Sequence, residues 1–262
     1  MSHPHVVMIH GAFCGGWAFE DFRKPFEAKG YRVHTPTVRG HTAAKPSRSL
    51  GATSIRDYAR DIERVLDEIG EPAVLIGHSM GGLIAQMVAA RRDVRAAVLL
   101  APSAPWGVLH STPFEIASAQ ALYMAGTFWS KPLKPSQWIA GANTLDLVPE
   151  PKHSRIFERF VPESGLAMFE IMHWALDLKG ATQFDARSVT CPILCFAGAR
   201  DRINPPATVR RIAQRYRGRC RYEELPGHSH WLLGEPGFEK IADRALGWLG
   251  SVLADESAAL KD

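Results

Sequence analysis

Cysteine is scarce in this sequence, with four residues in a chain of 262. Their spacing fits neither a zinc site nor a disulfide framework, and three of them lie in or beside predicted strands. We therefore expect no bound metal, and reduced, buried thiols of the kind found in cytosolic proteins. Cys14, which is close to the predicted site, is the one candidate for a reactive thiol. The four are Cys14, Cys191, Cys195 and Cys220.

Long apolar runs are also missing. No stretch is both long and apolar enough to span a membrane. The first residues, Met-Ser-His-Pro-His, do not form a charged region followed by an apolar one, so no secretory signal is visible. These absences predict a cytoplasmic protein without a membrane span.

The sequence has no large excess of charge of either sign, since its formal net charge is +4. It has no basic arm and no basic surface interleaved with aromatic residues, so we expect no nucleic-acid partner. The largest concentration of arginine lies between Arg200 and Arg221. We interpret it as a solvated helix face rather than a phosphate-binding patch.

Short apolar runs alternate with helical patterns over much of the chain, which predicts an α/β fold with a parallel sheet. Hydrophobic residues make up 46% and charged residues 22%, as is ordinary for a globular protein of one large domain or two small ones. The strand candidates are Val6–Ile9, Tyr31–Pro36, Ala73–Ile76, Ala96–Leu100, Pro192–Ala197 and Arg221–Leu225.

Helices are expected between these strands. The clearest follows the capping box Ser54-Ile55-Arg56-Asp57 and ends at Gly70. A helix carrying Phe19, Phe22 and Phe26 is expected after the first strand. Asn204-Pro205 is expected to open another, with Asn204 as its cap.

The third strand candidate runs directly into Gly77-His78-Ser79-Met80-Gly81, which satisfies the pattern G-x-S-x-G. A serine at a sharp strand-to-helix turn takes a strained backbone conformation, and a Cβ two residues to either side would clash. The following helix also directs backbone N–H groups toward the space beside the serine. Ser79 is therefore our candidate nucleophile.

The alternation breaks down between residues 103 and 187, a stretch that holds four of the seven tryptophans. Thr112-Pro113-Phe114-Glu115 and Pro162-Glu163 each predict the start of a helix there. We expect 103–187 to form a helical cap inserted into a core made of 1–102 and 188–262. Single aromatic residues there are expected to fill the cap's own core more often than to face the cleft. The candidates for substrate contact are Trp129, His173 and Trp174.

A serine nucleophile needs a base to take its proton and a carboxylate to orient that base. Asp201 follows a predicted strand through Gly198-Ala199-Arg200, which places it at the same sheet edge as Ser79. Two histidines, His228 and His230, follow the last strand, and topology does not separate them.

These motifs together resemble the α/β-hydrolase fold superfamily. The resemblance rests on His10-Gly11-Ala12, on the Ser79 motif, on the segment ending at Asp201 and on Pro226-Gly227 running on to Glu235-Pro236. It covers nearly the whole chain outside 103–187, and it implies a sheet of about six parallel strands and a triad in the order Ser, Asp, His.

The resemblance also assigns roles to single residues. Members commonly show Gly-x-x-His followed by a glutamate before a proline, which favours His230 over His228 as the base. The backbone N–H groups of Ala12 and Met80 are expected to form an oxyanion hole, which leaves the side chains of Phe13 and Met80 as walls of the acyl pocket. His78 is expected to pack rather than react, and His41 resembles a structural turn found in relatives.

We therefore expect a cofactor-free serine hydrolase that cleaves a small or medium carboxylic ester with an apolar portion. Other chemistry of serine-bearing relatives stays open: lactonase, thioesterase, perhydrolase, carbon–carbon hydrolase and hydroxynitrile lyase. A small-molecule receptor that retains the triad is the alternative from another class. The oligomeric state and the identity of the substrate are not predicted.

Overall fold

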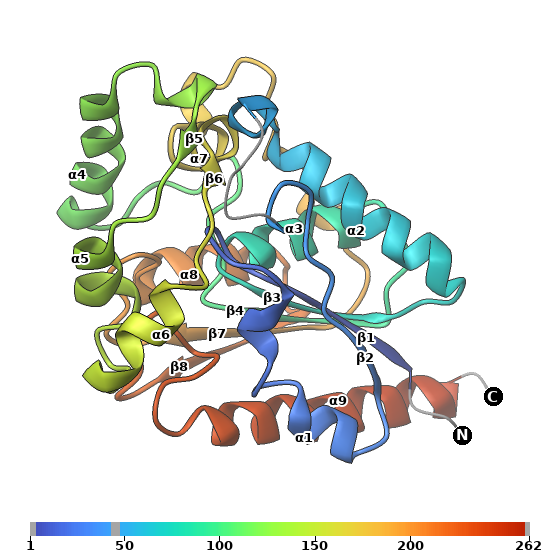
Figure 1. The fold of residues 1–262 in the computed structure, drawn as a ribbon. Helices are drawn as coiled ribbons and strands as arrows, with labels where there is room; N and C mark the ends of the chain where they lie inside the picture. The colour runs from blue at the N-terminus through green and yellow to red at the C-terminus, as the bar shows by residue number, and fades with distance from the viewer. Residues whose placement is uncertain (1–3, 43–47, 260–262) are drawn as a thin grey trace.

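A computed structural model describes residues 4–42 and 48–259. Its centre is a sheet of six strands, all parallel, in the order β2-β1-β3-β4-β7-β8 (Figure 1). This confirms the expected fold class, with shifts of a few residues at the strand ends. The strands are β1 (His5–Ile9), β2 (Arg32–His34), β3 (Val74–His78), β4 (Ala96–Leu100), β7 (Ile193–Gly198) and β8 (Cys220–Leu225).

Helices cover both faces of the sheet, because successive side chains of a strand point to opposite faces and the central strands are apolar on both. Val7 and Leu75 pack in one core, with α2 (Ile55–Ile69), α3 (Met80–Ala89) and α8 (Pro206–Gln214). Their neighbours along the strands pack in a second core, with α1 (Lys24–Ala28) and α9 (Phe238–Ala259). Figure 1 shows α1 and α9 together on one side of the sheet.

Helix α2 begins and ends where its capping signals predict. Ser54 accepts a hydrogen bond from Arg56 N, Asp57 closes the capping box, and Gly70 adopts the left-handed conformation at the C-terminus. The helix expected over Phe19, Phe22 and Phe26 is instead broken into a 3-10 turn, η1 (Gly16–Phe19), and the short α1. The three phenylalanines are nevertheless fully buried against each other.

The 103–187 segment lies between β4 and β7, beyond the carboxyl ends of the strands (Figure 1). Its main helices are α4 (Pro113–Ala121), α5 (Gln137–Ile139), α6 (His153–Phe157) and α7 (Gly165–Met172). The short turns are η3 (Leu122–Ala125), η4 (Phe128–Ser130), η5 (Ala140–Thr144), η6 (Glu150–Lys152), η7 (Trp174–Leu176) and η8 (Ala186–Ser188). The 3-10 helix η2 (Arg48–Ala52) precedes α2 in the core.

One helix start in this segment was predicted wrongly. Pro162-Glu163 does not open a helix, because Glu163–Ser164 forms a short strand, β6, which pairs antiparallel with β5 (Pro132–Leu133). Helix α7 begins at Gly165, with Ser164 as its N-cap. The side chain of Glu163 is buried and bonded to the core instead of capping a helix.

Three buried glutamates of the 103–187 segment accept hydrogen bonds from the core. Glu115 accepts from the Thr208 hydroxyl of α8 at 2.9 Å. Glu163 accepts from the Tyr58 hydroxyl of α2 at 2.7 Å. Glu170 accepts from the backbone N–H of Ile55, at the start of α2, at 2.8 Å. Carboxylates thus attach the segment to the core at three separate places.

The arginine-rich stretch is a surface of this fold, as expected. Arg210 pairs with Glu224, while Arg211 and Arg215 donate to the backbone carbonyls of Leu109 and Trp106. No helix in the described part of the chain is long and apolar enough to cross a membrane.

All four cysteines are free thiols. Cys14, Cys191 and Cys195 are buried, while Cys220 is half-buried. Burial raises the pKa of the Cys14 thiol well above its usual range, so this residue does not fit a reactive thiolate.

Candidate active site

Ser79 occupies the turn between β3 and α3, with φ of 53° and ψ of −119°. Non-glycine residues rarely adopt this region, so the turn is strained. Its two glycines are required by close approach. A Cβ on Gly77 would lie 2.2 Å from Gly81 O, and one on Gly81 would lie 2.0 Å from Ile9 O. The sequence of the motif therefore accounts for the turn.

A chain of hydrogen bonds leads away from Ser79. Its Oγ lies 3.1 Å from His230 Nε2, and His230 Nδ1 lies 2.8 Å from Asp201 Oδ2. Since an ionised carboxylate only accepts, Nδ1 carries the proton and Nε2 is left to accept from the serine hydroxyl. All three side chains are buried. An imidazole oriented in this way can take a proton from a serine hydroxyl.

Asp201 follows β7, and both of its carboxylate oxygens have hydrogen-bond partners. While Oδ2 faces His230, Oδ1 accepts from the backbone N–H groups of Ile203 and Asn204 at 2.8 and 2.9 Å. The expected capping role of Asn204 is wrong. Its side-chain amide donates to Ala101 O, and the N-cap of α8 is Pro205, without a side-chain hydrogen bond.

His228 does not reach the serine. Its Nδ1 lies 3.3 Å from Glu235 Oε2, so the structure brings His230 rather than His228 to Ser79. The carboxylate of Glu235 also accepts from Ser229 N and Trp231 N, at 2.8 and 2.9 Å. It therefore fixes the backbone on both sides of His230. The only sign of this role in the sequence is the Glu-Pro pair that follows the histidine.

His78 packs beside the site, as expected. Its Nε2 donates to His230 O at 2.8 Å, and its ring lies against those of His230 and Trp231. Burial, helped by the charge of His230, lowers the pKa of His78 to about 3. The ring is therefore neutral near pH 7 and fixes the backbone carbonyl of His230.

The loop after β1 passes directly over the nucleophile. A Cβ built on Gly11 would lie 3.1 Å from His78 Nδ1 and 3.2 Å from Ser79 Cβ, so a side chain here would be tightly packed against the nucleophile. His10 fixes the next peptide, because its Nδ1 lies 2.8 Å from Gly11 O while its Nε2 lies 3.2 Å from Val38 N. Burial lowers the pKa of His10 to about 4, so it too is neutral.

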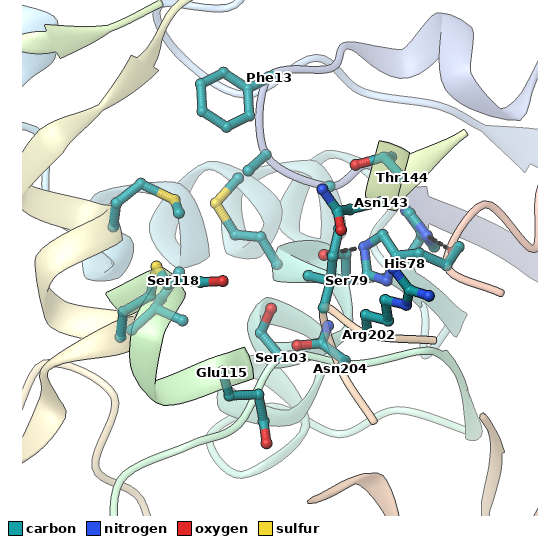
Figure 2. A pocket seen from close by; sticks show the side chains of 18 of the residues that line it. Phe13, His78, Ser79, Ser103, Glu115, Ser118, Asn143, Thr144, Arg202 and Asn204 are labelled. Carbon is teal, nitrogen blue, oxygen red and sulfur yellow. Dashed lines mark hydrogen bonds between the residues drawn. The ribbon is translucent and has the colours of Figure 1, made fainter. Parts of the chain in front are cut away.

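A cavity of about 250 Å³ opens onto Ser79 (Figure 2). The core contributes Ala12, Met80 and Asn204 among others, and the 103–187 segment supplies much of the other wall. Figure 2 shows Ser118 across the cavity from Ser79, while Glu115 points away from it. Apolar lining residues from the 103–187 segment are Phe114, Ile139, Phe160, Met168, Ile171 and Met172.

The two side chains expected as walls of the acyl pocket, Phe13 and Met80, both line this cavity, whereas Trp129, His173 and Trp174 do not. Trp129 and His173 belong instead to an aromatic cluster with Tyr123, Phe128 and Phe169. Trp174 packs edge-on against Trp106 and donates to Val108 O at 3.2 Å. These three predictions are wrong because the aromatic side chains pack against each other.

Several lining residues carried no signal in the sequence. Ser103 and Ser118 have hydroxyls in the cavity wall, and neither hydroxyl has a hydrogen-bond partner within the described ranges. Met168 and Met172 are spaced as an ordinary buried helix face, which sequence reasoning assigns to a core. No group of three or more potential metal ligands occurs among the residues that the structure describes.

Comparisons with known proteins all indicate the same protein family. A model of the alpha/beta hydrolase family matches residues 6–244. A pyrethroid hydrolase of Sphingobium wenxiniae is 30% identical over 100 residues, which are 38% of this chain and 35% of that protein. The carbendazim hydrolyzing esterase of a Nocardioides species is 36% identical over 94 residues, 33% of this chain and 36% of that protein. The chain thus matches only about a third of the length of these two relatives.

Other similarities extend over most of the chain. A pimeloyl-[acyl-carrier protein] methyl ester esterase of Neisseria meningitidis is 27% identical over 244 residues, 90% of each chain. The crystal structure of Paleococcus ferrophilus monoacylglycerol lipase superposes with a TM-score of 0.70 at 24% identity, covering 96% of this chain and 97% of that one. At this identity the structural likeness concerns the fold.

Proposed function

Because the chain belongs to the alpha/beta hydrolase family, we propose that it hydrolyses carboxylic esters through a covalent acyl-enzyme intermediate. The observation that carries the proposal is the unbroken chain of hydrogen bonds from Ser79 through His230 to Asp201, at the wall of a cavity. The esterase names of the relatives agree with it.

In the first half-reaction, Ser79 Oγ attacks the ester carbonyl carbon while its proton passes to His230 Nε2. The tetrahedral intermediate then collapses, the bond to the alcohol oxygen breaks, and His230 returns the proton to the departing alcohol. In the second, water attacks the acyl carbon with its proton going to His230; the bond from that carbon to Ser79 Oγ then breaks, His230 returns the proton to Ser79 Oγ, and the acid leaves. Asp201 holds the imidazole tautomer and stabilises the imidazolium throughout.

The oxyanion of the intermediate would be held by the N–H groups of Ala12 and Met80. Met80 is the first residue of α3, so its N–H has no partner within the helix and lies at the positive end of the helix dipole. Ala12 follows Gly11, on which an added Cβ would lie 3.2 Å from Ser79 Cβ, and Gly11 and Ala12 both line the cavity. Loss of one such donor typically costs about 2.7–4 kcal/mol of barrier.

The substrate would be a small or medium ester with an apolar portion. The cavity of about 250 Å³ is slightly smaller than the roughly 300–1,000 Å³ typical of ligand sites. Its wall from the 103–187 segment is largely apolar, so that segment would act as a cap that receives the apolar part of the ester.

Hydrolysis of a series of aryl esters of increasing acyl length tests the proposal. We expect the wild-type protein to turn over the shorter members, and Ser79→Ala to lower kcat at least ~10³-fold because the nucleophile is lost. A fluorophosphonate should label the wild-type protein at Ser79, as located by peptide mass spectrometry. Turnover that is equal in wild type and Ser79→Ala would contradict the proposal.

A further inference from the structure

Glu163 lies at the centre of a buried set of hydrogen bonds between the 103–187 segment and the core. Oε1 accepts from the Tyr58 hydroxyl at 2.7 Å and from Ser164 N at 2.6 Å. Oε2 faces His41 Nε2 at 2.9 Å and accepts from Phe13 N at 3.3 Å. The side chains of Glu163 and His41 are completely buried. A buried carboxylate with this set of donors is ionised and held in one position.

His41 is a cation in this arrangement. Its Nδ1 lies 3.0 Å from Arg39 O, while its Nε2 faces Glu163. Both partners only accept hydrogen bonds, so both ring nitrogens must carry protons. Burial by itself lowers the pKa of His41, but the charge and hydrogen bond of Glu163 outweigh it and raise the pKa above its ordinary value. For Glu163, burial raises the pKa, but the charge and hydrogen bond of His41, together with the hydrogen bonds from Tyr58 and Ser164, outweigh it, so the net pKa is lowered.

The Glu163–His41 ion pair holds Phe13, which lies in the loop after β1 next to Ala12. Phe13 has a φ of 62°, a left-handed conformation that is unfavourable for a phenylalanine. It is bonded from both sides to the 103–187 segment, because its N–H donates to Glu163 and its carbonyl accepts from Val161 N at 2.8 Å. The segment therefore maintains a strained conformation in the loop that passes over Ser79.

Two consecutive peptide groups of the loop are fixed in this way. The peptide between Gly11 and Ala12, which carries the Ala12 N–H, is held by His10 through Gly11 O. The next peptide, between Ala12 and Phe13, is held by Glu163 through Phe13 N. With both planes fixed, the direction of the Ala12 N–H is fixed as well.

We propose that the Glu163–His41 ion pair is a positioning device that aims the Ala12 N–H at the oxyanion during ester hydrolysis. The inference rests on the proposed function. It makes the 103–187 segment a part of the catalytic geometry as well as a wall of the cavity. Neither residue touches substrate: Glu163 and His41 act through Phe13.

The test is Glu163→Gln, which keeps the shape of the side chain and removes its charge. We expect kcat per active site, counted by fluorophosphonate titration, to fall roughly 10- to 100-fold because the oxyanion donor is misplaced. KM for the aryl ester should change less than about threefold, since the cavity wall is intact. The Ki of a trifluoromethyl ketone, whose adduct with Ser79 carries an oxyanion, should rise in parallel with the loss of kcat.

Glu170→Gln is the matched control. Glu170 also attaches the 103–187 segment to the core, through Ser54 Oγ and Ile55 N, but it contacts neither Phe13 nor the cavity. We expect kcat per site and Ki to stay at wild-type values in this variant. Equal losses in the two glutamine variants would overturn the inference, because they would show a general effect of segment attachment.

Should Glu163→Gln fail to fold, His41→Gln provides the same measurement with the carboxylate retained. We expect an intermediate loss of kcat per site and a raised Ki. If a folded Glu163→Gln or His41→Gln protein has the wild-type kcat per site and the wild-type Ki, the inference is overturned and the proposed function is unaffected. Absence of Ser79-dependent turnover by the wild-type protein would instead contradict the proposed function.

Discussion

Strained residues gather around the cavity. Among the described residues, four other than glycine have a positive φ: Phe13, Ser79, Ala101 and Arg217. Phe13 and Ser79 line the cavity, and Ala101 accepts a hydrogen bond from Asn204, which lines it too. Such conformations persist only where the surroundings hold them, and they are common at functional sites. The positive φ angles therefore indicate the same functional site as the Ser79 motif does.

Replacement of His230 and replacement of His228 should have clearly different effects on activity. His230→Ala should lower kcat at least ~10³-fold, because it removes the base that faces Ser79. His228→Ala should retain turnover within about tenfold, since that ring contacts Glu235 and not the serine. Steady-state hydrolysis of one aryl ester by both variants measures the difference. Loss of turnover in His228→Ala with activity retained in His230→Ala would show that the assignment is reversed.

Single residues were predictable where local geometry limits the choice. A strand followed by G-x-S-x-G leaves little freedom for Ser79, and a carboxylate directly after a strand must lie at the carboxyl edge of the sheet. His230 could be preferred to His228 only through the resemblance. Trp129 and Trp174 could not be placed, because an aromatic ring packs wherever tertiary contacts bury it, and those contacts are distant in sequence.

At the scale of elements, the connection from β3 to α3 needs glycine at position 81, because the helix passes very close to the end of β1. Gly81 is the second residue of α3, and a Cβ there would meet the backbone oxygens of Ile9 and His10 at 2.0 and 2.6 Å. Ile9 ends β1 and is in register with Gly77 of β3, so this backbone cannot shift without disturbing the pairing of the two strands. The helix must therefore move if the glycine is replaced.

Gly81→Ala should lower the free energy of unfolding by roughly 1–3 kcal/mol or more, because the added methyl group overpacks this contact. Urea denaturation measures the effect. Gly247→Ala is the matched control, since Gly247 lies in α9 with nothing within 4 Å of an added Cβ. There we expect a gain of about 0.5–1 kcal/mol from helix propensity. A Gly81→Ala protein as stable as wild type would contradict the close approach.

Elements with a repeated apolar pattern were predicted well, and their ends less so. Helix α2 has both an apolar stripe and capping residues, and its bounds agree with the prediction. Glu163 was misassigned because Pro-Glu is also a common way to begin a helix. What decides its conformation is the set of partners from α2 and the loop after β2, which lie more than 100 residues away.

At the scale of the whole molecule, the attachment of the 103–187 segment should depend on pH. Burial raises the pKa of the Glu170 carboxyl to about 7, opposed by hydrogen bonds from Ile55 N and Ser54. The ordinary pKa of the unfolded chain is 4.5. Between these two values the folded protein binds more protons than the unfolded protein. The free energy of unfolding therefore falls as the pH rises through this window.

Glu170→Gln should remove this dependence, because a glutamine amide is neutral at every pH. From pH 5 to pH 8 the wild-type protein should lose about 2–3 kcal/mol of unfolding free energy beyond what the variant loses. Urea denaturation of both proteins at the two pH values is the measurement. A constant difference between them would show that Glu170 does not change its proton binding on folding.

The arrangement of the whole molecule was only partly readable from the sequence. The alternation of strands and helices predicted the parallel sheet, which is confirmed. Its interruption after residue 102 predicted an inserted segment, whose limits stay a prediction. How that segment docks was hidden, because Glu115, Glu163 and Glu170 look like ordinary surface glutamates in a linear sequence. No sequence pattern around their partners, such as Thr208 and Tyr58, indicates that they bind these glutamates.

The three attachment points also limit which segments this core can accept. Each presents donors that water no longer reaches: the Thr208 hydroxyl, the pair of His41 and Tyr58, and the backbone N–H of Ile55 in the first turn of α2. A foreign segment grafted between β4 and β7 would leave these donors unsatisfied unless it brought an acceptor to each. Exchange of this part between relatives, in the laboratory or in evolution, is thus constrained more by three carboxylates than by the length or helix content of the insert.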